Sequence, residues 1–140
     1  MNKDYIIKTL KILNIKSPRF IDNKYVPFSY NDNVIYYHII EKNKFYINIF
    51  HELRHHYQYI YMKNNNDNYS KLIKSDFNNY DTNNYFNNFI ELDASAFSFI
   101  MANKLLKIND FSFINEYNLI TKFINNNIKL YERYLGEEYE

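Results

Sequence analysis

The sequence predicts an α+β fold in which several helices pack on one small mixed sheet. Three observations favour it. A short run of β-branched and aromatic side chains at residues 34–40 has the composition of a strand. Longer segments on both sides of this run have the apolar spacing that is typical of helices. Nothing along the chain indicates a repeat or a second unit, so we expect residues 1–140 to form a single domain.

The first third of the chain is expected to contain one helix and the strands. Residues 4–15 form an amphipathic pattern that ends before Pro18, because the residue before a proline disfavours helical dihedral angles. Residues 19–40 are expected to be extended, with a turn at the polar cluster 31–33. The strand at 34–40 could lie at the sheet edge and pair with an extended peptide, or it could be an ordinary core strand.

The rest of the chain is predicted to be mostly helical. We expect helices at residues 44–62 and 88–107, and one or two more at 111–134. Residues 63–87 are rich in Asn, Asp and Ser, which compete with the helical backbone for hydrogen bonds. This segment is therefore expected to be a loop or a broken helix.

Charge, hydropathy and cysteine content limit the classes of partner and site. The formal net charge is +1, so the chain lacks the basic excess of a nucleic-acid-binding protein, and we expect no nucleic-acid partner. The chain contains no run of about 20 apolar residues, the length that a membrane-spanning helix needs. The apolar run at 6–13 is interrupted by Lys8 and Lys11. We therefore expect a cytoplasmic protein without a membrane partner. Because the chain contains no cysteine, any metal must be held by His and carboxylate side chains.

One predicted helix carries residues with the spacing of a metal site. Residues 51–55 read H-E-L-R-H, so His51 and His55 lie one turn apart on the same helix face and can point to one ion. Glu52 lies at the edge of the same site, where it could accept a proton from a water that the metal activates. The pattern could also arise by chance on a surface helix, but apolar neighbours indicate that this helix is half buried.

A catalytic zinc normally has three protein ligands, so a third ligand must come from elsewhere in the chain. His56 lies about 140° around the helix from His51 and is expected to face away. His38 in the preceding strand could lie nearby. A carboxylate is the better candidate, and Glu91 opens the next well-defined helix about 40 residues on.

Glu91 is preferred to Asp93, which lies about 200° away around the same helix. The face of Glu91 carries small residues that would allow a close approach to the helix of the two histidines. The face of Asp93 carries large apolar residues, and a capping role in the first turn suits this carboxylate better.

These residues resemble the gluzincin metallopeptidases. H-E-L-R-H-H-Y-Q at 51–58, followed by E-L-D-A-S-A-F at 91–97, is similar to the pattern of their smallest members, the minigluzincins, and of related short phage and bacterial peptidase domains. The resemblance covers roughly residues 33–105, and it implies a minimal zincin-like fold around the H-E-x-x-H helix. It also implies a Zn²⁺ cofactor with Glu52 as the general base and three protein ligands: His51, His55 and Glu91.

The sequence departs from this family at several positions. Many gluzincins carry Gly before the second histidine, where this chain has Arg54. Many carry Asp after E-x-x-A, where this chain has Ser95, so Asp93 could take the place of that carboxylate or be unrelated to it. No histidine follows the Glu91 helix, so a Tyr or Arg would have to stabilise the oxyanion. Late candidates, for which ordinary helix-surface roles are favoured, are Tyr131, Arg133 and Tyr134.

The leading functional hypothesis is a zinc-dependent peptidase that hydrolyses peptide bonds of a peptide or protein substrate, with Glu52 as base. The alternative is a non-catalytic, zinc-stabilised protein-binding module. The presence of Glu52 argues against that alternative, because a structural zinc site needs no base. Residues 137–140 are expected to be a solvated acidic tail, although they could fold back on the zinc and inhibit the site. No feature of the sequence indicates an oligomeric state.

Overall fold

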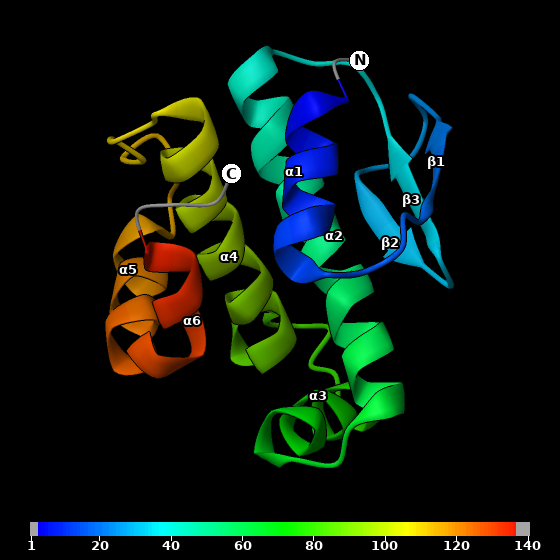
Figure 1. Ribbon diagram of the computed structural model, residues 1–140, viewed down its shortest axis with the longest axis vertical. Coiled ribbons are helices and arrows are strands. Elements are labelled where there is room, and N and C mark those ends of the chain that lie inside the picture. The colour runs from blue at the N-terminus through cyan, green and yellow to red at the C-terminus, as the bar shows by residue number, and fades with distance from the viewer. Residues whose placement is uncertain (1–2, 137–140) are drawn as a thin grey trace.

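The computed structural model describes residues 3–136, so the tail predicted at 137–140 lies outside the described residues. The described chain contains six α-helices, one short 3-10 helix and three strands, which confirms the predicted α+β class (Figure 1). In chain order the elements are α1 (Asp4–Leu13), β1 (Arg19–Asp22), β2 (Ser29–Asn31), β3 (Val34–Tyr37), α2 (Lys42–Asn64), α3 (Asn68–Asn78), η1 (Tyr85–Asn87), α4 (Phe89–Leu106), α5 (Tyr117–Asn126) and α6 (Ile128–Leu135).

The sheet is small and mixed, with strand order β1-β3-β2. β3 pairs parallel to β1 and antiparallel to β2, so it is the central strand and not an edge. The possibility that residues 34–40 form the sheet edge is therefore wrong, and β2 lies at that side instead. The β2–β3 hairpin turns at Asp32 and Asn33, whose φ angles of 46° and 67° are left-handed. Short polar side chains tolerate this conformation, which a two-residue hairpin turn requires.

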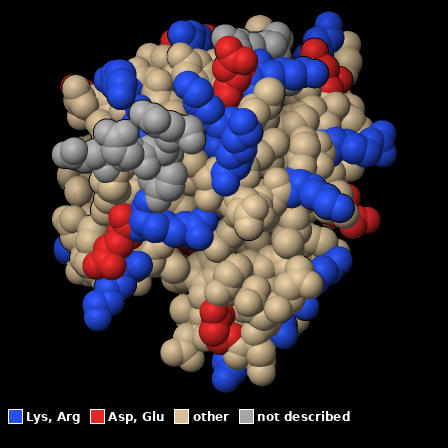
Figure 2. All heavy atoms as spheres, viewed as in Figure 1, with Lys and Arg blue, Asp and Glu red and all other residues tan. Residues whose placement is uncertain are grey.

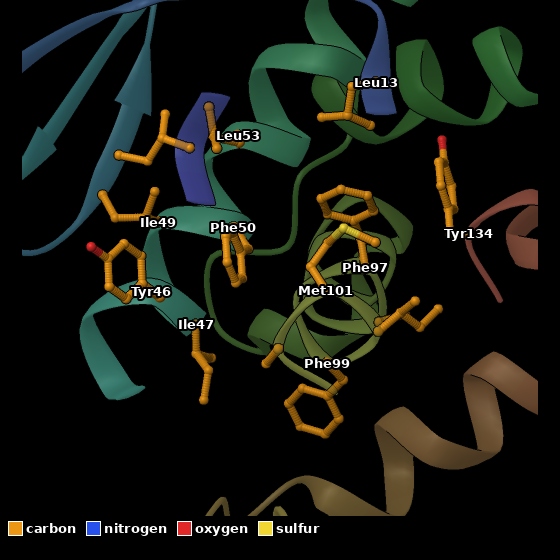
Figure 3. Close-up of a cluster of buried hydrophobic side chains, with 14 of the residues drawn as sticks. Leu13, Tyr46, Ile47, Ile49, Phe50, Leu53, Phe97, Phe99, Met101 and Tyr134 are labelled. Carbon is orange, nitrogen blue, oxygen red and sulfur yellow. The ribbon is translucent and has the colours of Figure 1, made fainter. Parts of the chain in front are cut away.

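The centre of the molecule is the contact between α2 and α4. The sheet lies on one side of α2 and α4 lies on the other, while α5 and α6 pack against the far side of α4 (Figure 1). Figure 3 shows Phe50 and Leu53 of α2 in the same apolar core as Phe97 and Met101 of α4. All four side chains are fully buried, and this packing fixes the two helices relative to each other.

The face of α4 that carries Glu91 is made of small side chains, as the sequence predicted. Its next members toward the C-terminus, which are all buried, are Ala94, Ser95, Ser98 and Ala102. Small side chains let two helix backbones approach closely. The N-terminal end of α4 therefore lies against the middle of α2.

The polar segment at 63–87 is largely ordered around α3 and η1. Asp67 caps α3 by accepting a hydrogen bond from the backbone N–H of Ser70 at 3.0 Å. Asp76, near the end of α3, accepts one from the backbone N–H of Ile90 in the first turn of α4 at 2.8 Å. The start of α4 is thus capped by a side chain from another helix, which ties α3 to the first turn of α4.

The surface of the described chain carries both signs of charge. On the face shown in Figure 2, Lys and Arg side chains are scattered, with Asp and Glu among them. None of the helices in residues 3–136 is long and apolar enough to cross a lipid bilayer.

Candidate metal centre

Three side chains from two helices bring their ligand atoms to one point. Nε2 of His51 lies 3.2 Å from Oε1 of Glu91, and Nε2 of His55 lies 2.8 Å from the same oxygen. The two Nε2 atoms are 3.1 Å apart. A tetrahedral ion bound at 2.0–2.1 Å keeps its ligand atoms about 3.3–3.4 Å apart, so the observed separations fit one small cation. Within the described chain, this trio is the group of His and carboxylate side chains that could hold a metal.

The elements position these atoms as the sequence spacing predicted. His51 and His55 project from one face of α2, one turn apart, and Glu91 lies in the first turn of α4, where the small-residue face touches α2. The other oxygen of Glu91, Oε2, accepts a 2.5 Å hydrogen bond from the hydroxyl of Tyr80. This bond orients the carboxylate so that Oε1 faces the histidines.

The second nitrogen of each imidazole also has a partner. Nδ1 of His51 lies 3.2 Å from Oγ of Ser95, and Nδ1 of His55 lies 2.8 Å from Oε1 of Gln58. Metal-binding histidines are commonly oriented by a hydrogen bond at the nitrogen that does not bind. Ser95, at the position where the resemblance implies an Asp, supplies a hydroxyl to His51 instead of a carboxylate.

Glu52 borders an open cleft on both sides of the cluster. A cavity of about 800 Å³ lies on the His55 side, and its wall includes Tyr30 of β2. A second cavity of about 420 Å³ lies on the His51 side, and Glu52 and Tyr85 contribute to both walls. The first cavity is within the size range of sites that bind small molecules. The cluster of His51, His55 and Glu91 is therefore reachable from solvent through a cleft that Glu52 also borders.

The contacts within the cluster strongly perturb the pKa values of His55 and Glu91. Burial lowers the pKa of His55, but the hydrogen bond that the imidazole donates to Glu91 and the nearby charge of Glu52 outweigh this effect and raise the pKa to about 9. Burial alone would raise the pKa of Glu91, but hydrogen bonds and charge from His51 and His55 lower it well below its ordinary range. These shifts favour a protonated His55 beside an ionised Glu91. A bound metal ion would supply the positive charge in place of that proton.

The other two histidines lie away from this centre. His56 faces the opposite side of α2, as expected, because its Nε2 lies 2.9 Å from the backbone oxygen of Lys16 and its Nδ1 lies 2.9 Å from the hydroxyl of Tyr30. His38 follows β3 and packs on Phe28, with ring centroids 4.9 Å apart. Neither belongs to the group of side chains that could hold a metal.

Asp93 does not cap the helix. Its side chain is fully buried and forms an ion pair with Arg54 of α2, through two N–O contacts of 3.1 Å each. The capping interpretation is wrong because the face of α4 that carries Asp93 is covered by α2 and α6, and a carboxylate buried there requires a cationic partner.

The late oxyanion candidates do not reach the cleft. Tyr131 is fully buried and donates to Asp93 at 2.7 Å, and Tyr134 accepts from Arg54 at 2.9 Å. Arg133 donates to the backbone oxygen of Ile12. The surface role favoured for Tyr131 and Tyr134 is also wrong, because both are buried beside the ion pair of Arg54 and Asp93.

Three residues near the centre were missed from the sequence. Tyr80 and Tyr85 come from the polar segment before α4, and their signal is hidden because tyrosine occurs 16 times in the chain. Gln58 could have been found, since it follows His55 by three residues and such pairs are neighbours on a helix.

No protein-family model, no curated protein and no solved structure matches this chain. What the site can do must therefore be argued from its own geometry.

Proposed function

We propose that the protein is a zinc-dependent peptidase with a zincin-like site, in which His51, His55 and Glu91 hold one Zn²⁺ and Glu52 is the general base. The observation that carries the proposal is the convergence of two Nε2 atoms and one carboxylate oxygen within 3.2 Å of one another, beside an open cleft. Two imidazoles and one carboxylate are a donor set that catalytic zinc accepts, with a fourth position left for substrate or water.

When bound, Zn²⁺ would polarise the scissile carbonyl and lower the pKa of the attacking water to about 7. Glu52 removes the proton from that water as its oxygen adds to the carbonyl carbon. Its carboxylate borders both cavities of the cleft, where it can accept this proton. Glu52 then delivers the proton to the amide nitrogen as the C–N bond breaks, which yields a carboxylic acid and an amine.

Tyr85 is placed to stabilise the negative charge that develops on the carbonyl oxygen. Its hydroxyl lies 2.9 Å from Nε2 of His51 and contributes to the wall of both cavities. A hydrogen-bond donor aimed at the developing oxyanion is among the larger contributions to acyl-transfer catalysis. In this proposal a residue of η1 takes the role for which the sequence offered only late candidates: Tyr131, Arg133 and Tyr134.

A peptide or protein substrate is favoured by the cleft. The wall on the His51 side is largely apolar, with Ile47, Phe99 and Ile120 among its members, and the cavity on the other side is larger. An extended chain could therefore pass the cluster with a side chain on each side. A non-catalytic binding module is less well supported, because structural zinc sites are closed by four protein ligands whereas three converge here.

The experiment compares metal content and cleavage in the wild type and in Glu52→Gln. We expect about one zinc per purified chain, and cleavage of a mixed peptide library that a chelator abolishes and added zinc restores. Glu52→Gln should keep its zinc and lose roughly 10²–10⁴-fold in rate, because it removes only the general base.

The outcomes separate the hypotheses. Wild-type protein with stoichiometric zinc and no cleavage of any peptide would indicate the binding module. If the protein binds no zinc even when zinc is added, the proposed metal centre is wrong. If Glu52→Gln is fully active, the assignment of Glu52 as the general base is wrong.

A further inference from the structure

We propose that Gln58 is a positioning residue that fixes the proton of His55 on Nδ1 and thereby presents Nε2 to the metal, and that the buried Arg54–Asp93 ion pair holds Gln58 in the required orientation. The inference rests on the metal centre proposed above. It goes beyond that centre because none of these three residues is a ligand, a base or part of the cleft wall.

The argument begins with Asp93, whose carboxylate is completely buried and surrounded by donors. Arg54 donates to both of its oxygens at 3.1 Å, the hydroxyls of Tyr69 and Tyr131 donate at 2.5 and 2.7 Å, and the side-chain amide of Gln58 donates at 2.8 Å. A carboxylate that accepts five hydrogen bonds, two of them from one guanidinium that binds both oxygens, is stabilised in the ionised form. Asp93 can therefore only accept hydrogen bonds.

This fixes the orientation of the Gln58 amide, which is also fully buried. Its nitrogen donates to the backbone oxygen of Ile90 at 3.0 Å and to Oδ2 of Asp93 at 2.8 Å. Both partners are acceptors, so rotating the amide by 180° would set its oxygen against two other oxygens, with no proton to bridge either contact. The amide NH₂ must face α4, and Oε1 must face His55.

The orientation of Gln58 in turn fixes the state of His55. Oε1 of Gln58 lies 2.8 Å from Nδ1 of His55 and can only accept, so Nδ1 must carry the hydrogen. When His55 is neutral, Nε2 then has its lone pair free, and it is Nε2 that faces Glu91 and His51. The chain of bonds from Asp93 through Gln58 therefore selects the tautomer that binds a metal through Nε2.

The partner of His51 lacks this constraint. Oγ of Ser95 lies 3.2 Å from Nδ1 of His51, and a hydroxyl can either donate or accept. Ser95 thus accommodates both tautomers of His51, whereas Gln58 accepts one state of His55. We infer that the site is preorganised chiefly through His55.

The ion pair that supports Gln58 is itself enclosed by aromatic rings. The guanidinium of Arg54 lies 4.5 Å from the ring centroid of Tyr57 and 5.0 Å from that of Phe97. A buried ion pair is weak evidence for stability, since apolar replacements are often as stable. Its specific role comes from the hydrogen bond between Asp93 and Gln58. Gln58 in turn contacts the proposed ligand His55 on α2 and the backbone oxygen of Ile90, next to Glu91, on α4. In sequence terms, H-E-x-R-H-x-x-Q at 51–58 and E-x-D at 91–93 act as one unit.

The test compares Gln58→Leu with Tyr131→Phe, a matched control that also removes one hydrogen bond to Asp93 but has no link to His55. Zinc affinity is measured by competition with a chromophoric chelator. We expect Gln58→Leu to bind zinc roughly 10–100-fold more weakly, as is typical when a partner of a metal-binding histidine is lost. Tyr131→Phe should bind zinc as the wild type does, even if its melting temperature falls. Gln58→Met replaces Gln58→Leu if that variant does not fold.

A second readout follows the imidazole proton itself by ¹H–¹⁵N nuclear magnetic resonance of the zinc-loaded protein. In the wild type and in Tyr131→Phe, the Nδ1–H of His55 should be present and exchange slowly with water. In Gln58→Leu it should exchange faster, while the Nδ1–H of His51 is unchanged.

Three results would overturn the inference: equal zinc affinity of Gln58→Leu and the wild type, equal losses in both variants, or a wild-type His55 protonated on Nε2. In each case a wild type that still binds zinc leaves the proposed function standing. If the wild type binds no zinc, both the proposed metal centre and this inference are wrong.

Discussion

The hydroxyl of Tyr85 lies 2.9 Å from Nε2 of His51, the same nitrogen that faces Oε1 of Glu91. The phenol ring stacks on the imidazole, with centroids 6.3 Å apart and planes at 19° to each other. Burial, and then the charge of Glu91, raise the pKa of Tyr85 above its ordinary value, so the hydroxyl keeps its proton at neutral pH. Tyr85 is thus a hydrogen-bond donor at the rim of the proposed metal centre.

Replacing Tyr85 by Phe should lower kcat roughly 10²–10³-fold, as loss of one oxyanion donor does, and leave zinc content unchanged. Tyr80→Phe is the matched control, because its hydroxyl binds the ligand Glu91 and should affect zinc affinity instead. Steady-state kinetics and zinc titration of both variants separate the two roles. Equal loss of zinc from both would contradict a direct role of Tyr85 in the reaction.

Glu91→Gln is expected to abolish tight zinc binding, because an amide oxygen is a much poorer zinc ligand than a carboxylate. Asp93→Asn should still take up one zinc per chain when zinc is in excess, since Asp93 lies outside the ligand cluster. The zinc content of the Glu91→Gln and Asp93→Asn variants, measured after dialysis against excess zinc, tests which carboxylate is the ligand. Normal uptake by Glu91→Gln together with none by Asp93→Asn would show that the ligand assignment is wrong.

Breaking the buried ion pair should destabilise the fold strongly. Arg54→Met leaves the carboxylate of Asp93 buried without its cation, which typically costs about 3–5 kcal/mol in the free energy of unfolding. Arg54→Met combined with Asp93→Leu should recover part of that loss, because no uncompensated charge remains. Denaturant unfolding of the metal-free single and double variants measures the coupling. Additive losses would mean that the two side chains do not act as a pair.

Zinc binding should release protons below about pH 9. The metal-free site holds a proton on His55, whose pKa is raised to about 9, and a metal ion must displace it from Nε2. We expect about one proton released per zinc at pH 7.5, and an affinity that falls about tenfold per pH unit as the pH decreases. Calorimetry in buffers of different ionisation enthalpy measures the release. A zinc affinity independent of pH between 6.5 and 8.5 would contradict it.

The same shift makes a prediction for the metal-free fold. Since the folded pKa of His55 lies above the unfolded value of about 6.5, its contribution to stability is full below that value and is lost as the pH rises through about 9. His55→Gln should lack this dependence. Melting temperatures of both proteins from pH 6 to 10, in the presence of a chelator, make the comparison.

The parts of the site that sequence reasoning predicted are those set by local geometry. His51 and His55 depend only on the periodicity of one helix, and Glu91 follows from the small side chains that share its face. Tyr80 and Tyr85 could not be placed this way, because the path of their segment depends on side-chain contacts. One such contact is made by the side chain of Asn88, which accepts a hydrogen bond from the backbone N–H of Asp81 and donates one to the backbone oxygen of Asp81.

Asp93 shows a different limit. The local sequence pattern predicted that Asp93 caps the helix, because a carboxylate near the start of a helix commonly interacts with exposed backbone N–H groups. Its real environment is set by Arg54, 39 residues earlier, and by Tyr131, 38 residues later. Burial of a charge is decided by such distant partners, which one-dimensional spacing does not reveal. The central position of β3 was hidden for the same reason, since β1 pairs with β3 although β2 lies between them in the sequence.

The capping of α4 by Asp76 has a consequence for how the molecule opens. Residues 68–88 carry that cap together with Tyr80 and Tyr85, yet α3 buries only Ser70 and Ile73, whereas the α2–α4 contact is fully packed. The free energy needed to detach this segment is therefore smaller than that of global unfolding. A partial opening of this kind would release Glu91 from Tyr80 and uncap its helix while both histidines stay in place. The rate at which the site exchanges its ion would then follow the hydrogen exchange of one peripheral helix and not the stability of the core.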